Sequence, residues 1–266
     1  MITSALKSLL EKWPPFSTAP KSFTLTSARL SSAGGREENQ DAQGEIQLPD
    51  KTQLYVVADG LGGHGGGAVA SAIAVQHILT HAPTNFTFTP EGLDHLKEGA
   101  HQAIKQEQIR NTKLERMRTT LVILAIRQQH ALWLHCGDAR LYHFRGDQIL
   151  SQTRDHSVPQ MLVSSGDIPA EEIRHHPDRN RVLRALGGDA NEAKAAIQKT
   201  PVPLQPGDHF LLCTDGFWDW VLETEMQQTL KQNGIPNVWL QTMEKILLAR
   251  AHGEFDNYTA QAIAIG

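Results

Sequence analysis

The segment TTLVILAIRQQHALWLHCGDARLYHFRGDQIL (residues 119–150) restricts the possible folds of this chain more than any other. It contains apolar runs separated by short polar turns, and nothing between them is long enough to form a helix. Parallel strands need a crossover connection of a dozen or more residues, so we predict that these strands are antiparallel. The segment therefore favours an α+β layered domain over an alternating β-α-β series.

Further strands and helices are predicted on both sides of this segment. Apolar or alternating runs predict strands at 22–31, 53–59, 208–216 and 257–265. Apolar residues at helical spacing predict helices at 66–82, 90–112, 157–166, 222–232 and 236–251. Residues 167–190 are polar and mixed in charge, so we interpret them as a surface insertion.

Composition limits the class of protein. The chain has 266 residues, of which 40% are hydrophobic and 20% charged, as expected for one large packed domain or at most two. The net charge of −4 does not support nucleic-acid binding, which would need a basic excess. Two cysteines, Cys136 and Cys213, lie in apolar runs, and we interpret them as buried thiols in a reducing compartment.

The N-terminal residues do not resemble a targeting or membrane segment. No apolar run approaches the roughly 20 residues that a membrane span needs. Residues 1–20 lack a signal-peptide core, and they are expected to form a tail with a short amphipathic helix ended by Pro14 and Pro15. We therefore expect a cytoplasmic protein with a single domain over 21–266.

The glycine-rich stretch VVADGLGGHGGG (56–67) raises the possibility of a dinucleotide site, because Gly60, Gly62 and Gly65 fit G-x-G-x-x-G. Such a fold carries an acidic residue about 20 positions later, but residues 61–90 contain no Asp or Glu. Asp59 directly precedes the glycines and would repel a pyrophosphate. An NAD-dependent oxidoreductase is therefore disfavoured.

Several aspartates follow or precede apolar strands instead. Asp59 follows LYVVA and Asp215 follows FLLCT, each directly before a glycine, and Asp138 follows LWLHCG. A single Asp-Gly is commonly only a turn. A buried carboxylate needs a partner, however, and no Lys or Arg adjoins Asp59 or Asp215. A cluster of hard oxygen ligands suits Mg²⁺ or Mn²⁺.

Eight motifs, in order along the chain, resemble those of the metal-dependent Ser/Thr protein phosphatases, the type 2C or PPM family, and particularly its bacterial members. They are GGREENQDA (34–42), VVADGLGGHGGG (56–67), MRTTLV (117–122), HCGDARLY (135–142), TRDHS (153–157), RVLRALGG (181–188), PGDHFLLCTDGFWD (206–219) and FDNYTAQAIAI (255–265). The resemblance implies a four-layer α-β-β-α sandwich with two central antiparallel sheets, flanked by helices, and with a flap at about 164–190.

The resemblance also implies a metal centre with two Mn²⁺ or Mg²⁺ ions. Asp59 would bridge the ions, and the Gly60 carbonyl would hold the first of them. Asp215 and Asp256 would join Asp59 at the second ion. Asp138, with Asp215, would make a weaker third site.

Other residues would act around these ions. Arg36 would bind the phosphate, although a surface ion pair with Glu37 or Glu38 is the alternative. Asp41 would act on bound water, and Asn257 would support Asp256.

Two positions depart from the family pattern. Leu61 stands where some eukaryotic members have a histidine that serves as general acid, and His64 is the nearest histidine in sequence. Gln40 stands where some members have a glutamate near the bound water, which we expect to alter water positioning and metal affinity.

The implied function is hydrolysis of phosphoserine and phosphothreonine in proteins by a metal-activated water, with Arg36, Asp41 and Asp59 as the catalytic residues. The substrates would be phosphoproteins of a bacterial signalling pathway, made by a cognate Ser/Thr kinase. A pseudophosphatase acting as a regulatory binding module is the alternative. In the flap, Arg174 and Arg179 are expected either to form a basic lip for a phosphorylated segment or to lie in a solvated loop.

Overall fold

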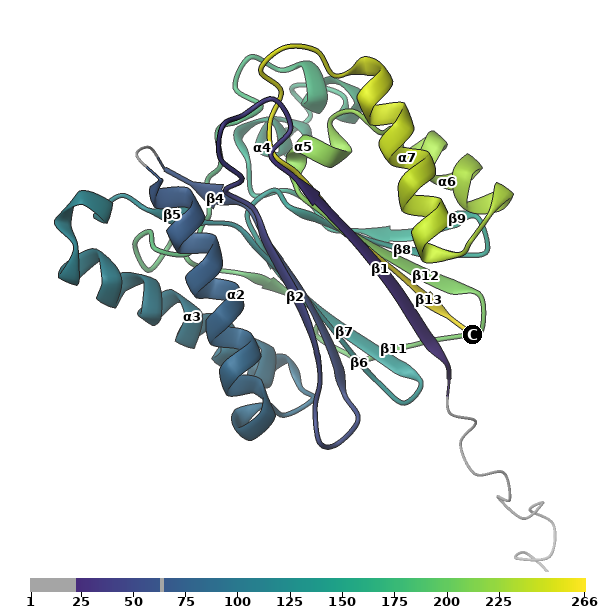
Figure 1. Ribbon diagram of the computed structural model, residues 1–266, viewed down its shortest axis with the longest axis horizontal. Helices are drawn as coiled ribbons and strands as arrows, with labels where there is room; N and C mark the ends of the chain where they lie inside the picture. Colours follow the sequence, from purple (N-terminus) through teal and green to yellow (C-terminus); the bar gives the residue numbers. More distant parts are fainter. Residues whose placement is uncertain (1–22, 63–64) are drawn as a thin grey trace, which may run out of the picture.

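A computed structural model describes residues 23–62 and 65–266 of the chain, and Figure 1 shows its layers. Two antiparallel sheets lie face to face, and helices cover the outer face of each sheet. One outer layer is α2 (Gly66–Asn85) and α3 (Pro90–Arg110), and the other includes α6 (Glu223–Gln232) and α7 (Pro236–Arg250). The predicted α-β-β-α sandwich is confirmed. The tail predicted at 1–20, and His64, lie outside the described residues.

The first sheet joins strands from both ends of the described chain. Its order is β1 (Leu25–Ser32), β13 (Tyr258–Ile265), β12 (Asp208–Cys213), β8 (Arg140–Arg145) and β9 (Gln148–Gln152). β1 pairs with β13 over its whole length, from Leu25 opposite Ile265 to Ser32 opposite Tyr258. The first sheet is therefore complete only when these two strands, which are far apart in the sequence, have paired.

The second sheet carries the glycine-rich loop at one end. Its order is β10 (Ala196–Ile197), β7 (His130–Cys136), β6 (Leu121–Arg127), β3 (Gln53–Ala58) and β2 (Ala42–Gln47), and β11 (Val202–Pro203) also pairs with β7. A separate small ribbon joins β4 (Gly60–Leu61) to β5 (Arg118–Thr119). Because β3 pairs antiparallel with both β2 and β6, it cannot belong to the parallel β-α-β unit of a dinucleotide fold.

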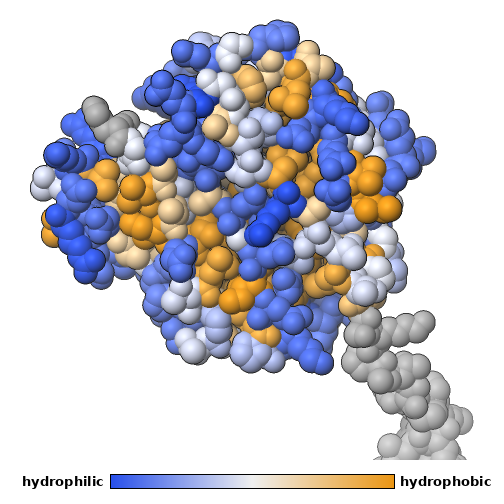
Figure 2. Space-filling view, in the orientation of Figure 1, coloured by the Kyte–Doolittle hydropathy of each residue, from blue (hydrophilic) through white to orange (hydrophobic). Residues whose placement is uncertain are grey.

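The inner strands of the two sheets are buried on both faces, which explains why their sequences are continuously apolar. The edge strands β1, β2 and β9 are partly exposed, and Figure 2 shows polar and apolar side chains mixed over the front of the molecule, where β1 and β2 lie. In β3, Leu54 and Val56 face the helices α2 and α3, whereas Tyr55 and Val57 face the opposite sheet. Successive side chains of a strand point to opposite faces, so each apolar run contributes to two cores at once. Burial on both faces removes the alternation that would otherwise mark a strand.

The segment 119–150 forms β6 to β9, and its neighbouring strands pair antiparallel within each sheet as predicted. β7 and β8 nevertheless belong to different sheets, although only residues 137–139 separate them. Gly137 makes this crossing possible with φ of 106°, and a Cβ atom there would lie 2.6 Å from the Thr120 Cγ2 atom. The crossing places Asp138 at the end of both sheets.

Two predicted elements differ from the structure. The strand predicted at 208–216 ends at Cys213, because Asp215 begins the short helix α5 (Asp215–Trp218), whose turn is closed by the Asp219 N–H on the Asp215 carbonyl. The insertion at 167–190 follows α4 (Val158–Ser165) and contains a 3₁₀ helix, η2 (Ala170–His175). A second 3₁₀ helix, η1 (Thr112–Leu114), follows α3. In the described part of the chain, each helix is too short or too polar to cross a membrane.

Gly137→Ala should lower the free energy of unfolding by roughly 3 kcal/mol, since strain at positive φ and overlap with Thr120 act together. Gly146→Ala is the matched control, because Gly146 also has positive φ but an added Cβ would meet nothing within 4 Å. Its cost should be about 1 kcal/mol. Urea denaturation monitored by fluorescence measures both, and equal losses would contradict the crossing argument.

Candidate active site

The loop after β3 is held rigidly by two threonines. The Asp59 N–H donates to the Thr120 Oγ1 atom at 3.0 Å, and the Asp59 carbonyl accepts from the Thr119 hydroxyl at 2.8 Å. Gly60 follows directly, and a Cβ atom at this position would lie 2.2 Å from the Gly67 carbonyl oxygen. Glycine is therefore required where β3 turns into β4, and Asp59 is fixed at the end of the sheet.

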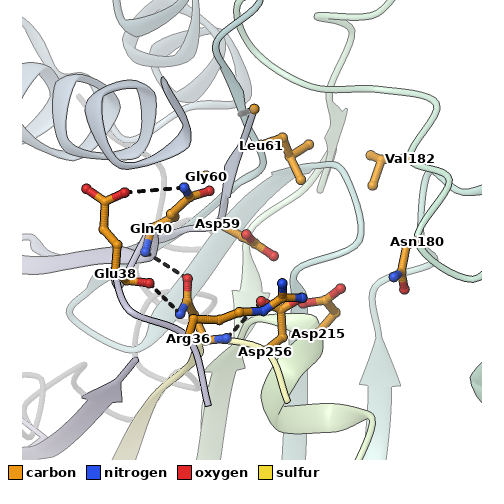
Figure 3. A pocket seen from close by; sticks show the side chains of 12 residues that line it. Arg36, Glu38, Gln40, Asp59, Gly60, Leu61, Asn180, Val182, Asp215 and Asp256 are labelled. Carbon is orange, nitrogen blue, oxygen red and sulfur yellow. Dashed lines mark hydrogen bonds and ion pairs between the residues drawn. The ribbon is translucent and has the colours of Figure 1, made fainter. Parts of the chain in front are cut away.

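A pocket of about 400 Å³ opens at this end of the sandwich. Its lining is Arg36, Glu38, Gln40, Asp59, Gly60, Leu61, Gly62, Asn180, Val182, Asp215, Asp256 and Asn257. Figure 3 shows Asp59 between Arg36, Asp215 and Asp256 on one side and Leu61 and Val182 on the other. The structure therefore brings together most of the site residues predicted from the sequence.

The other two predicted aspartates lie behind this lining. Asp41 and Asp138 do not line the pocket, but both carboxylates help to raise the pKa of Asp59. The Asp41 Oδ2 atom accepts a hydrogen bond from the Thr214 hydroxyl at 2.9 Å. Asp138 is held through its main-chain carbonyl, which accepts from the Trp218 indole at 3.0 Å.

Burial makes these carboxylates unusually reluctant to ionise. It is the largest cause of the raised pKa of Asp59, followed by repulsion from Asp215, Asp41 and Asp138. Burial also raises the pKa of Asp215 and of Asp138, and it raises that of Asp41 to about 7. The charged forms of these carboxylates are therefore unfavourable unless a positive charge compensates them.

The donor atoms fit a hard divalent cation. The Asp41 Oδ1 and Asp138 Oδ1 atoms are buried without a hydrogen-bond partner, as expected of oxygens that face a positive charge or its bound water. As the side chains stand, no three Asp, Glu, His or Cys residues of 23–62 and 65–266 form a ligand group. Asp256 is engaged in other contacts, since its Oδ2 atom lies 3.5 Å from Arg36 Nη2 and its Oδ1 atom accepts from the Asn257 N–H.

Arg36 and Asn257 both contact Asp256, and Asn257 makes further hydrogen bonds to the loop that carries Arg36. The half-exposed Arg36 side chain pairs with Asp256 rather than with Glu37 or Glu38. The Asn257 amide donates to the carbonyls of Ala33 and Glu38, both at 2.9 Å, and accepts from the Gln40 N–H at 2.8 Å. Asn257 thus supports Asp256 through its backbone and holds the Arg36 loop with its side chain.

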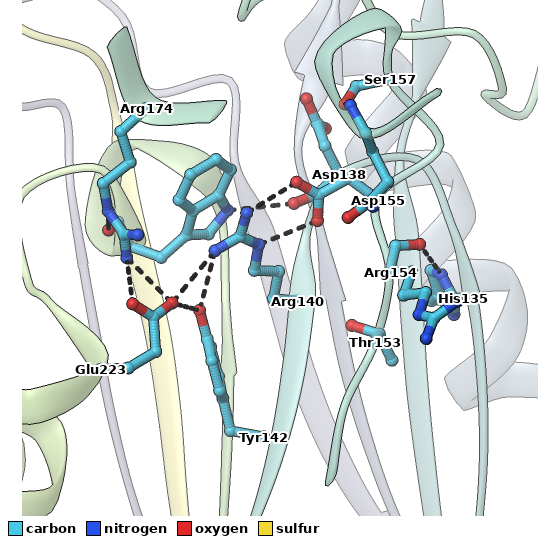
Figure 4. A network of polar contacts seen from close by, with 12 residues as sticks. His135, Asp138, Arg140, Tyr142, Thr153, Arg154, Asp155, Ser157, Arg174 and Glu223 are labelled. Atoms are coloured by element: carbon cyan, nitrogen blue, oxygen red, sulfur yellow. Dashed lines mark hydrogen bonds and ion pairs between the residues drawn. The ribbon is translucent and has the colours of Figure 1, made fainter. Parts of the chain in front are cut away.

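A buried polar network beneath Asp138 was not anticipated from the sequence (Figure 4). The Arg140 guanidinium binds both oxygens of Asp155 at 2.8 and 2.7 Å and lies 3.4 Å above the Trp218 ring. It also reaches Glu223 at 3.2 Å. The signal in the sequence was an arginine inside the apolar run HCGDARLY, because a buried arginine requires an acidic partner.

Arg174 belongs to this network, so it neither forms a basic lip nor lies in a solvated loop, and both predictions for it are wrong. Its side chain is only 12% exposed, lies 2.9 Å from a Glu223 oxygen and donates to the Trp218 carbonyl at 3.0 Å. Arg179 differs, since it is exposed and lies 3.7 Å from an Asp219 oxygen.

Asp219 is a further acidic residue that sequence reasoning missed. It lines a smaller depression of about 160 Å³ that shares Arg36, Asp215 and Asp256 with the main pocket. Burial raises its pKa to about 7, and its Oδ1 atom has no hydrogen-bond partner. Its spacing of four residues from Asp215, one turn of α5, was the available signal.

These features define a protein with buried acidic residues at the open end of a double-sheet sandwich. Residues 31–247 match the family model described as Protein phosphatase 2C, and the chain belongs to this family.

Individual relatives agree with this assignment. The serine/threonine phosphatase stp of Listeria innocua is 35% identical over 202 residues, which cover 74% of this chain and 79% of that protein. The serine/threonine protein phosphatase PstP of Mycobacterium tuberculosis is 32% identical over 221 residues, 82% of this chain and 41% of that protein. A solved PstP catalytic domain in complex with two manganese ions has a TM-score of 0.77, 27% identity, and coverage of 91% of this chain and 99% of that one.

Arg140→Ala should lower the free energy of unfolding by roughly 3–5 kcal/mol, because it leaves the buried Asp155 without its partner. Arg118→Ala provides the control, since Arg118 pairs with Glu192 at a half-exposed surface and should cost less than about 1 kcal/mol. Chemical denaturation measures both variants. Similar losses in the two would show that the network contributes little.

Proposed function

We propose that the pocket around Asp59 hydrolyses phosphoserine and phosphothreonine esters of proteins. The chain is a serine/threonine protein phosphatase, as its family and its relatives indicate. The observation that carries the proposal for the site is the buried carboxylate set around Asp59, which faces a pocket with Arg36 at its rim. If these buried carboxylates bound nothing in the pocket, they would only destabilise the fold.

The phosphatase is metal-dependent, and Asp59, the Gly60 carbonyl, Asp215 and Asp256 would hold two divalent ions, Mn²⁺ or Mg²⁺. Asp138, together with Asp215, would supply a third position. Carboxylate and carbonyl oxygens suit both metals, and the PstP structure with two manganese ions supports the number. Such ions neutralise phosphate oxygens and lower the pKa of a bound water so that it can attack phosphorus near neutral pH.

The residues of the chain would orient the substrate. Arg36 is half-exposed and presents a planar fork of N–H donors that matches two phosphate oxygens. Binding a phosphate would release Asp256 from its present ion pair with Arg36, so that the carboxylate becomes free to act as a ligand. Asp41, fixed by Thr214, would orient the attacking water, and Gln40 and Asn257 would hold the surrounding loop.

The wider setting follows from the same assignment. Residues 21–266 would act as one catalytic domain, with residues 164–190 as a flap beside the pocket. The substrates would be phosphoproteins made by a cognate Ser/Thr kinase of a bacterial signalling pathway. Cys136 and Cys213 are buried free thiols, which supports a reducing, cytoplasmic environment.

Asp59→Asn should reduce phosphatase activity toward a phosphoprotein and a small phosphate ester by at least about 100-fold, and chelation of the wild type should do so reversibly. The control is Glu91→Gln, because Glu91 is exposed in the first turn of α3 and does not line the pocket. Initial rates with added Mn²⁺ measure the effect. Full activity of Asp59→Asn would overturn the assignment of the site, and an inactive wild type would instead favour a pseudophosphatase.

Metal binding should also appear without any turnover. Mn²⁺ at about 100 times its Kd should raise the Tm of the wild type by roughly 5–10 °C, because the ion binds only the folded state. Asp59→Asn should respond much less to Mn²⁺. In chelator it should melt above the wild type, because burial and repulsion raise the pKa of Asp59 and so cost free energy on folding near neutral pH. Thermal melts with and without Mn²⁺ test this, and an equal response of both proteins would contradict it.

A further inference from the structure

Two apolar side chains line one side of the pocket, where the polar Asn180 lies near Val182, and the chemistry described above does not use them. Leu61 and Val182 stand across the pocket from Arg36, Asp215 and Asp256 (Figure 3). Neither side chain can hold a cation, bind a phosphate or transfer a proton. Both are only partly buried, so they present apolar surface to the inside of the pocket. We call Leu61 and Val182 the apolar wall.

Leu61 has a fixed position in the fold. It lies in β4, where it pairs with Arg118 of β5 in the small two-stranded ribbon. The preceding Gly60 donates its N–H to the Gln40 carbonyl at 3.1 Å. Leu61 is therefore held by the same backbone contacts that hold Asp59 and Gly60.

Val182 is fixed from the other side, although it lies within the flap, whose residues before it are mostly exposed. It forms a bridge with Ser157. On either side of it, the Val158 N–H donates to the Arg181 carbonyl at 3.0 Å, and the Leu183 N–H donates to the His156 carbonyl at 2.7 Å. The two halves of the apolar wall thus come from separate elements that the backbone holds in place, as a preorganised binding surface requires.

Charge decides how a substrate can lie in this pocket. The dianionic phosphate must face Arg36 and the carboxylates with their ions, so the carbon side of the ester faces away from them. Residues next to the phosphorylated side chain then pass the apolar wall. A charged neighbour would lose hydration against Leu61 and Val182, which offer no polar atom, whereas an aliphatic neighbour would remove apolar surface from water.

We propose that the apolar wall receives an aliphatic side chain directly next to the phosphorylated Ser or Thr, and so selects among phosphoprotein substrates. The proposal rests on the proposed function and refines it, because it concerns which phosphoproteins the same pocket accepts. It also gives a role to Leu61, at the position where the family resemblance implies a general-acid histidine in some eukaryotic members.

The test compares two phosphopeptides that differ only in the residues on both sides of the phosphoserine, Leu in one and Ala in the other. The wild type with Mn²⁺ should hydrolyse the Leu peptide with a kcat/KM about three- to tenfold higher, as a few partly buried methylenes allow. In the double variant Leu61→Ala, Val182→Ala this ratio should fall to about one, mainly through KM. O-phosphoserine, which has no neighbours, should be hydrolysed at nearly the wild-type rate.

Leu183→Ala is the matched control, because Leu183 is adjacent to Val182 and 41% exposed but does not line the pocket. It should keep the wild-type ratio. A wild type that does not distinguish the two peptides, a double variant that keeps the ratio, or an equal effect of Leu183→Ala would overturn the proposal.

Two further results separate this proposal from its alternatives. The Ala peptide is also prepared with phosphothreonine in place of phosphoserine. If the double variant loses only a preference for phosphothreonine over phosphoserine, the wall contacts the threonine methyl and the proposal is wrong. If the wild type hydrolyses none of these esters with Mn²⁺, the proposed function itself has failed. Circular dichroism and the response of the Tm to Mn²⁺ confirm that each variant is folded and binds metal.

Discussion

The burial of several carboxylates close together at one end of the sandwich, with the repulsion that follows, is the constraint on which the rest of the structure depends. Asp41, Asp59, Asp138 and Asp215 come from four separate chain segments, and each has a raised pKa. Groups that repel one another can be held together only by a scaffold that cannot relax. Here each of them adjoins a strand that is hydrogen-bonded on one or both sides, and the strands next to Asp59, Asp138 and Asp215 are also buried on both faces. The threonines around Asp59 and Asp41 anchor the loops without neutralising the acids.

Much of this scaffold could be predicted because its signals are local. Apolar runs identify the strands, and short connections show that β6 is antiparallel to β7 and β8 to β9. Aspartates at strand ends indicate where the site lies. The crossing at Gly137 could not be predicted, because the runs before and after it are equally apolar and do not reveal which sheet each joins. The pairing of β1 with β13 is likewise a choice between partners far apart in sequence.

The site shows the same division between local and distant information. Motif order along the chain pointed to Arg36, Asp59, Gly60, Asp215 and Asp256, and these residues do line one pocket. It could not show that Arg36 pairs with Asp256, or that Arg174 is committed to Glu223 and Arg140 to Asp155. A sequence reveals that a charge is present but not the direction in which its side chain points. For Arg174 that direction changes its role from substrate contact to internal support.

The pairing of β1 with β13 has a consequence for how the molecule folds. The loop with Arg36 and Asp41 follows β1, and Asp256 and Asn257 precede β13, so the pocket is complete only when these two strands have met. Closing so long a loop is entropically costly, and domains rich in such distant contacts fold slowly. Catalytic competence should therefore require this pairing, and no partly folded intermediate that lacks it can act on a phosphoprotein.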